Sequence, residues 1–225
     1  AKISNINLQT GNLIWSKKSE YPFNSGIKIY KDKIFVVDFK NTLRCFYLKD
    51  GTECWSVKTE ESFIVSSSKF SILIKNNLVI YNNSLGDITA VDISSGLIEW
   101  QLPTQKSSII NETYSFNFSK LVSDGRSIYF SNNKNQFYSV DLMSGTTNWI
   151  NEINSILTPI IIGNLIFSIT EDGYLFTIQK EEGNIIRIND IYKNFNLKKR
   201  KKIKPTGFVI GENNLYLTNS DGNLI

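Results

Sequence analysis

The densest chemical feature of the sequence is a basic run from Lys198 to Lys204, which places six positive charges in seven positions. A run of this kind can attract an acidic protein partner, an anionic lipid surface or a nucleic acid. Nucleic acid is the weakest of these, because the net charge is only +4 and aromatic residues do not alternate with the basic ones. The nearby Tyr192 and Phe195 are expected to be no more than two aromatics of an exposed loop. The alternative to a contact surface is a solvated loop in a lysine-rich protein. The candidate contact residues are Lys198, Lys199, Arg200, Lys201 and Lys202.

The second candidate for chemistry is a pair of cysteines, Cys45 and Cys54, which flank the turn at Lys49-Asp50-Gly51 at similar distances. A disulfide across this hairpin would suit an oxidising compartment. The alternative is two unpaired thiols, because a shift of one residue in the strand register would point the side chains to opposite faces.

Catalytic chemistry finds little support in the sequence. Histidine is absent from all 225 residues, which removes His-based acid–base catalysis, Ser-His-Asp systems and most zinc sites. No Gly-rich phosphate-binding motif is present. Acidic residues such as Asp87, Asp172 and Asp221 fall in turns, where turn geometry accounts for them. We therefore expect no catalytic, cofactor-binding or metal site, no small-molecule substrate and no enzymatic activity.

The elements that position these residues follow from a repeat. Each tryptophan of the chain comes four residues after a glycine, and a degenerate copy runs from Gly183 to Arg187. The repeat residues are Gly11, Trp15, Gly51, Trp55, Gly96, Trp100, Gly145, Trp149 and Gly183, with glycine spacings of 40, 45, 49 and 38 residues. A period near 40–45 residues built of short strands is typical of a β-propeller. A tryptophan at one position of every repeat indicates a shared packing role at the seams between blades.

Within each repeat, short apolar or alternating runs are separated by turn residues, as expected for antiparallel strands. In one copy the runs are 70–74, 78–81, 87–91 and 97–100. No stretch has a convincing helical period. We predict an all-β propeller of four-stranded blades in a single domain over 1–225. Its complete blades are 26–57, 68–102, 117–153 and 158–190, and its partial blades are 1–20 and 205–225.

Two expectations concern the extent of this array. Both ends contribute a third strand, which favours a fragment of a seven- or eight-bladed ring over a closed ring of five blades. The longest repeat contains the stretch 104–117, and extra length in a repeat often forms a loop on the binding face. Tyr114 and Phe116 are therefore candidate partner contacts, unless the stretch is an outer strand that covers its own blade.

The repeat resembles that of the PQQ-like propeller superfamily over essentially the whole chain. The clearest copy is F-Y-S-V-D-L-M-S-G-T-T-N-W at 137–149. This resemblance is specific for the fold and weak for function, because the superfamily includes quinone-dependent dehydrogenases and non-catalytic scaffolds. The dehydrogenases typically carry adjacent cysteines and an Asp, Asn and Glu set around calcium. Cys45 and Cys54 are not adjacent, so no quinone site is expected in these residues.

Within the superfamily, the chain is most similar to the propeller lipoprotein family of the outer-membrane β-barrel assembly machinery. That resemblance implies a non-catalytic protein-interaction scaffold at the periplasmic side of the outer membrane. Its inter-blade loops would dock onto a barrel-assembly subunit, and membrane association would come from an anchor outside these residues. No signal peptide or transmembrane run is visible. The alternatives are a fragment of a quinone-dependent dehydrogenase and a sensory ectodomain.

Overall fold

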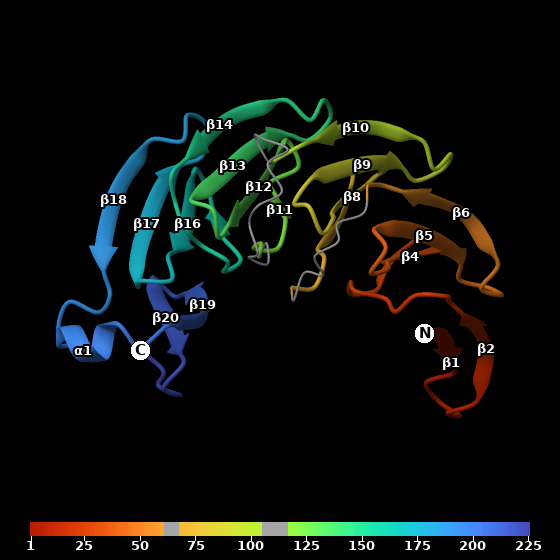
Figure 1. The fold of residues 1–225 in the computed structure, drawn as a ribbon, viewed down its shortest axis with the longest axis horizontal. Coiled ribbons are helices and arrows are strands. Elements are labelled where there is room, and N and C mark those ends of the chain that lie inside the picture. The colour runs from red at the N-terminus through yellow and green to blue at the C-terminus, as the bar shows by residue number, and fades with distance from the viewer. Residues whose placement is uncertain (61–67, 105–116) are drawn as a thin grey trace. The chain divides into compact units, whose positions relative to one another are not determined.

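The computed structural model describes residues 1–60, 68–104 and 117–225 (Figure 1). They form antiparallel sheets whose strands follow one another in chain order. The chain divides into two compact units, Ala1–Phe116 and Asn117–Ile225. The predicted all-β propeller class, with its four-stranded antiparallel blades, is confirmed. The single domain over the whole chain stays a prediction.

The first unit contains one two-stranded sheet and two four-stranded sheets. The two-stranded sheet pairs β1 (Lys2–Ile6) with β2 (Leu13–Lys18). The next sheet has the order β3 (Lys28–Tyr30), β4 (Lys33–Val37), β5 (Thr42–Tyr47) and β6 (Glu53–Lys58). The third has the order β7 (Ile72–Lys75), β8 (Leu78–Asn82), β9 (Ile88–Asp92) and β10 (Ile98–Leu102).

In the second unit the strands of each sheet also pair in chain order, as an antiparallel meander. Its first sheet contains β11 (Val122–Ser123), β12 (Ser127–Asn132), β13 (Gln136–Asp141) and β14 (Thr147–Asn151). Its second contains β15 (Ile160–Ile162), β16 (Leu165–Ile169), β17 (Tyr174–Gln179) and β18 (Ile185–Asp190). A short helix, α1 (Leu197–Arg200), precedes the hairpin of β19 (Pro205–Gly211) and β20 (Asn214–Asn219). The sequence did not predict this helix.

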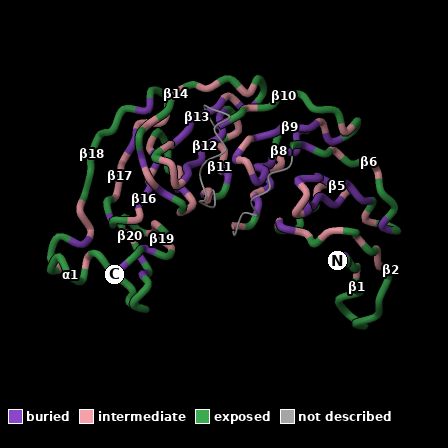
Figure 2. The backbone as a smooth tube through the Cα atoms, viewed as in Figure 1, coloured by how far each residue is buried: buried purple, intermediate pink, exposed green. Residues whose placement is uncertain are grey.

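Burial is concentrated in the second and third strands of the four-stranded sheets, as Figure 2 shows. Every residue of β8 and β12 is buried, whereas five of the six residues of the outer strand β18 are exposed. An inner strand has a hydrogen-bonded neighbour on each side and apolar contacts on its faces, so its side chains leave water. The inner strands therefore supply most of the buried apolar side chains.

The last hairpin of each four-stranded sheet places a glycine in the left-handed region, followed by a β-bulge. At Gly96, φ is +74°, and its N–H donates to the Asp92 carbonyl at 3.0 Å. The Asp92 carboxylate accepts from the N–H groups of Ser94 and Ser95 at 2.9 and 2.8 Å. The register then shifts between Ile98 and Trp100. This combination is a common hairpin closure, because the bulge restores the strand twist after the turn.

The same glycine is also the surface on which the tryptophan of the preceding sheet lies. A Cβ placed on Gly96 would be 2.6 Å from Cγ of Trp55, and the Trp55 Nε1–H donates to the Ile93 carbonyl at 3.1 Å. Trp15 has this relation to Gly51 and the Leu48 carbonyl, and Trp149 has it to Gly183 and the Lys180 carbonyl. The repeated glycine therefore meets two demands, a left-handed turn and a flat platform for an indole ring.

Candidate interaction surface

The basic run lies in a loop, residues 191–204, that joins β18 to β19; we call it the basic loop. Two apolar side chains anchor it: Tyr192 has no exposed surface, and Ile203 is 1% exposed. A Cβ on Gly173 would collide with the Tyr192 ring, so the ring covers the turn between β16 and β17. The Tyr192 and Phe195 rings stack with centroids 5.6 Å apart. The expectation that both aromatics are exposed is wrong: Tyr192 is buried and Phe195 half-buried, because Tyr192 packs with Ile203 and Leu217 in the core.

Within the basic loop, Asn196 caps the N-terminus of α1, and its side-chain oxygen accepts the Lys199 N–H at 2.9 Å. Such a cap satisfies a backbone donor that has no partner within the helix. Lys201 N–H donates to the Leu197 carbonyl, and Ile203 N–H donates to the Lys199 carbonyl. These bonds give the basic run a defined backbone, although a run of lysines carries no helical pattern that the sequence could reveal.

Three of the positive side chains contact the protein itself. Arg200 forms an ion pair with Asp190 at 2.9 Å and lies over the Tyr174 ring, 5.9 Å from its centroid. The Lys204 ammonium donates to Glu171 at 2.8 Å, and this hydrogen bond raises the pKa of Lys204. Lys199 Nζ lies 4.6 Å from the centroid of the Phe195 ring. The Arg200 and Lys204 contacts hold the basic loop against β17, β18 and the turn between β16 and β17, whereas the Lys199 contact lies within the loop.

The other positive side chains of the basic loop face solvent. Lys193, Lys198, Lys201 and Lys202 are exposed and form no ion pair with any described residue. Leu197 stands beside them with 75% of its surface exposed. The five residues named from the sequence therefore separate into three groups: Arg200 contacts β17 and β18, Lys199 contacts Phe195 within the loop, and Lys198, Lys201 and Lys202 are available to a partner.

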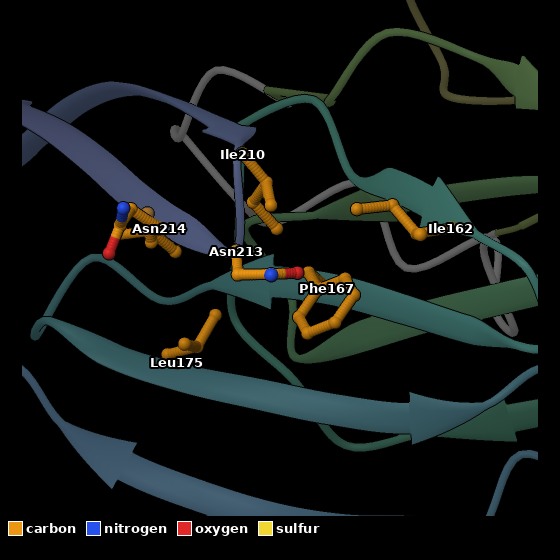
Figure 3. A pocket seen from close by; sticks show the side chains of 7 residues that line it. Ile162, Phe167, Leu175, Ile210, Asn213 and Asn214 are labelled. Carbon is orange, nitrogen blue, oxygen red and sulfur yellow. The ribbon is translucent and has the colours of Figure 1, made fainter.

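An apolar groove lies in the same unit, between β15–β17 and the β19–β20 hairpin (Figure 3). Its volume is about 330 Å³, and five of its seven lining residues are apolar. Ile162, Phe167 and Leu175 line one side, and Ile210, Leu215 and the asparagines of the hairpin line the other. Ile162 is 47% exposed at this groove. Sequence reasoning missed the groove, because its walls come from strands about 40 residues apart.

A polar cavity of about 250 Å³ lies between the sheets β11–β14 and β15–β18. Its lining includes Arg126, Tyr129, Asn148 and Lys180. The Lys180 ammonium lies 2.9 Å from an Asp124 carboxylate oxygen beside it. Burial raises the pKa of Asp124, but N–H donors of Ser127 and Arg126 together with Lys180 outweigh it and hold the pKa at about 2.

The lowered pKa of Asp124 predicts a pH-dependent stability. Because the folded pKa of Asp124 is below the unfolded value of about 3.9, its contribution is present above about pH 4 and is lost as the pH falls toward about 2. Asp124→Asn should therefore destabilise the protein at pH 6, and the difference from wild type should shrink at pH 2.5. Urea denaturation followed by circular dichroism measures it. An equal difference at both pH values would show that the carboxylate charge does not contribute.

Cys45 and Cys54 are free thiols in the structure, in contact with each other. Cys45 pairs with Trp55, and the bulge between Cys45 and Phe46 leaves Cys54 as the extra residue on β6. Both thiols pack in the same apolar cluster, so the bulge resolves the register question left by the sequence. Burial and the hydrogen bond with Cys54 raise the pKa of Cys45 well above its usual range. The disulfide between them stays a prediction.

Two further expectations concern other parts of the chain. Tyr114 and Phe116 lie outside the described residues, so their role as contacts stays a prediction. Within the described ranges, no group of three or more His, Cys, Asp or Glu side chains could hold a metal ion. No helix in that part of the chain is long and apolar enough to cross a membrane.

The structure is similar to solved structures of other proteins. BamB from Moraxella catarrhalis matches with a TM-score of 0.70 and 15% identity, over 99% of this chain and 77% of that one. A europium-containing methanol dehydrogenase matches with a TM-score of 0.68 and 11% identity, over 84% of this chain and 47% of that one. At these identities the structural matches show the fold alone.

Among curated proteins, an uncharacterized protein of Rickettsia prowazekii (strain Madrid E) is 20% identical over 160 residues. The match covers 69% of this chain and 38% of that relative, so the chain spans well under half of its length. The model of one family, described as outer membrane protein assembly factor BamB, matches residues 1–189. The described glycine–tryptophan seams and, apart from the last residue of β18, the four-stranded sheets fall within that match. The chain belongs to this PQQ-like propeller family.

Proposed function

We propose that the protein is a non-catalytic interaction scaffold of the bacterial cell envelope that assists the assembly of outer-membrane β-barrel proteins. The observation that carries this proposal is the match of the family model, described as an outer membrane protein assembly factor, to residues 1–189. The structural likeness to BamB over 99% of the chain supports it. Its place would be the periplasmic side of the outer membrane.

The geometry suits docking by loops on a rigid support. Each seam with a described tryptophan–glycine pair is closed by an indole ring on a glycine and by a hydrogen bond from the indole N–H to a carbonyl. A loop held on such sheets loses little conformational freedom when a partner binds, which lowers the cost of association. The proposed partner is a protein subunit of the barrel-assembly machinery, and its contacts are the inter-blade segments, including Tyr114 and Phe116.

Recovery of partners from the native envelope tests this proposal. The protein, tagged and expressed at its natural length, is purified in mild detergent, and the co-purifying proteins are identified by mass spectrometry. We expect outer-membrane assembly subunits in the tagged sample and not in a sample from untagged cells. Recovery of the folded protein without any assembly subunit would contradict the proposal.

The structural likeness to a methanol dehydrogenase supports a second candidate function, that of a quinone-dependent dehydrogenase or of a part of one. This candidate requires a bound quinone, which absorbs light and can reduce an artificial dye in the presence of its metal and an alcohol. The same purified sample therefore distinguishes the two functions. Quinone absorbance together with metal-dependent dye reduction would contradict the scaffold proposal and support an enzymatic function.

A further inference from the structure

We propose that the basic loop binds the surface of an anionic lipid bilayer, with Leu197 entering the headgroup region and Lys193, Lys198, Lys201 and Lys202 above the lipid phosphates. This contact goes beyond the proposed scaffold function, because it needs no protein partner. It would add a contact within these residues to the anchor outside them that the family resemblance implies. A scaffold that works at a membrane would be oriented by it.

Among the described residues, the ion pairs of the basic loop involve only Arg200 and Lys204, so four positive charges of the loop remain available to a membrane. Asp190 is occupied by Arg200, and Glu171 is occupied by Lys204. The four solvent-facing lysines form no ion pair with a described residue, so their charge is not compensated within the loop. An uncompensated cluster of ammonium groups at the surface is attracted to anionic headgroups over about a Debye length.

The side-chain types favour a lipid over an acidic protein segment. Lysine is depleted at protein interfaces, where arginine is enriched because its planar head forms paired hydrogen bonds. Here the available residues are all lysines, and the single arginine of the loop is bound to Asp190. Leu197, 75% exposed among these lysines, gives the loop an apolar tip of the kind that enters the boundary between headgroups and acyl chains.

The anchoring of the loop makes the proposal testable without loss of the fold. Tyr192 and Ile203 are buried beneath the loop, whereas Leu197 and the four lysines contribute no buried surface to the core. Substitutions at the exposed positions should therefore leave the far-ultraviolet circular dichroism and the urea midpoint unchanged. Arg200 and Lys204 are kept in every variant, because they hold the loop to the fold.

The test measures sedimentation of the purified chain with vesicles of phosphatidylglycerol and phosphatidylcholine, and with vesicles of phosphatidylcholine alone. We expect binding to the anionic vesicles only, and a decrease as salt is added. Each lysine near an anionic surface changes the partition coefficient by about fivefold, so the triple variant K198S/K201S/K202S should lose on the order of 100-fold. Leu197→Ser should lower binding several-fold through lost apolar contact.

A matched control removes the same charge elsewhere. Lys2, Lys18 and Lys28 are exposed in the first unit, and the variant K2S/K18S/K28S should bind the anionic vesicles almost as well as wild type. Equal losses in the two triple variants would overturn the proposal in favour of a net-charge effect. Undiminished binding of K198S/K201S/K202S would also overturn it.

Polyglutamate distinguishes an acidic protein from a lipid as the partner. If polyglutamate competes fully with the vesicles and Leu197→Ser binds like wild type, the loop is a contact for an acidic protein and the lipid proposal is wrong. Because the vesicle assay contains no assembly subunit, its result is independent of the scaffold proposal. Recovery of assembly subunits could fail while vesicle binding succeeds, and the reverse could also occur.

Discussion

Replacing Trp149, which is half-buried and packs against the core, by alanine should lower the free energy of unfolding by about 3–5 kcal/mol, the range for truncating a large aromatic that is packed. The indole ring stacks on Phe137, with ring centroids 5.8 Å apart, and lies against Gly183 of the next sheet. Its Nε1–H donates to the Lys180 carbonyl at 3.0 Å. The substitution therefore removes apolar filling and one of the hydrogen bonds between β11–β14 and β15–β18.

Urea denaturation followed by circular dichroism measures this loss, and two variants on the same strand separate its causes. Trp149→Phe keeps an aromatic ring but leaves the Lys180 carbonyl without its donor, so we expect a smaller loss of about 1–3 kcal/mol. Ile150→Ala changes the next residue, which is 44% exposed, and should cost less than Trp149→Ala. A loss below about 1 kcal/mol for Trp149→Ala would contradict a packed seam, because core truncations cost more than this.

The part of the fold that the sequence predicts is the part that depends on local pattern. Alternating apolar residues specify strands, and a polar residue followed by glycine specifies the hairpin, so the four-stranded sheets follow from stretches of about five residues each. The repeat spacing then indicates the propeller, because each repeat forms one small sheet that can bury its faces only against equivalent neighbouring sheets. The sequence pattern therefore predicts that the tryptophans pack at the seams between sheets. It does not predict that Trp15, Trp55 and Trp149 each lie on a glycine of the next sheet.

The candidate surface was less predictable, because its features depend on residues distant in sequence. Tyr192 is buried because Gly173, in another hairpin, leaves room for its ring. In the sequence, Arg200 and Lys204 cannot be distinguished from the other charges of the run. In the structure they form ion pairs with Asp190 and Glu171. A basic run by itself cannot reveal which of its charges are compensated. The apolar groove likewise exists only where β15–β17 meet the β19–β20 hairpin.

The double role of the repeated glycine predicts an unusually costly substitution. Gly96→Ala should destabilise the first unit by about 2–5 kcal/mol, the sum of a backbone cost and a steric cost. The left-handed φ of +74° costs an L-residue about 1–2 kcal/mol. The new methyl group would also lie 2.6 Å from Cγ of Trp55, and overpacking of this kind adds about 1–3 kcal/mol. Unfolding in urea, monitored by circular dichroism, gives the value.

Gly11→Ala is the matched control. Gly11 has nearly the same φ, +71°, and apart from its chain neighbours no atom of the described residues lies within 4 Å of the place that the new methyl group would take. Its substitution should cost only the backbone contribution of about 1–2 kcal/mol. A double-mutant cycle then isolates the steric contribution: in the Gly96→Ala background, Trp55→Ala should cost at least about 1 kcal/mol less than in wild type, because the ring is already displaced.

The cycle decides why glycine and tryptophan recur together in this chain. Equal losses at Gly11 and Gly96, with additive effects in the cycle, would mean that the glycine is required for the turn alone. A larger loss at Gly96 with non-additivity would mean that the two residues recur together because each blade supplies the platform for the ring of the blade before it.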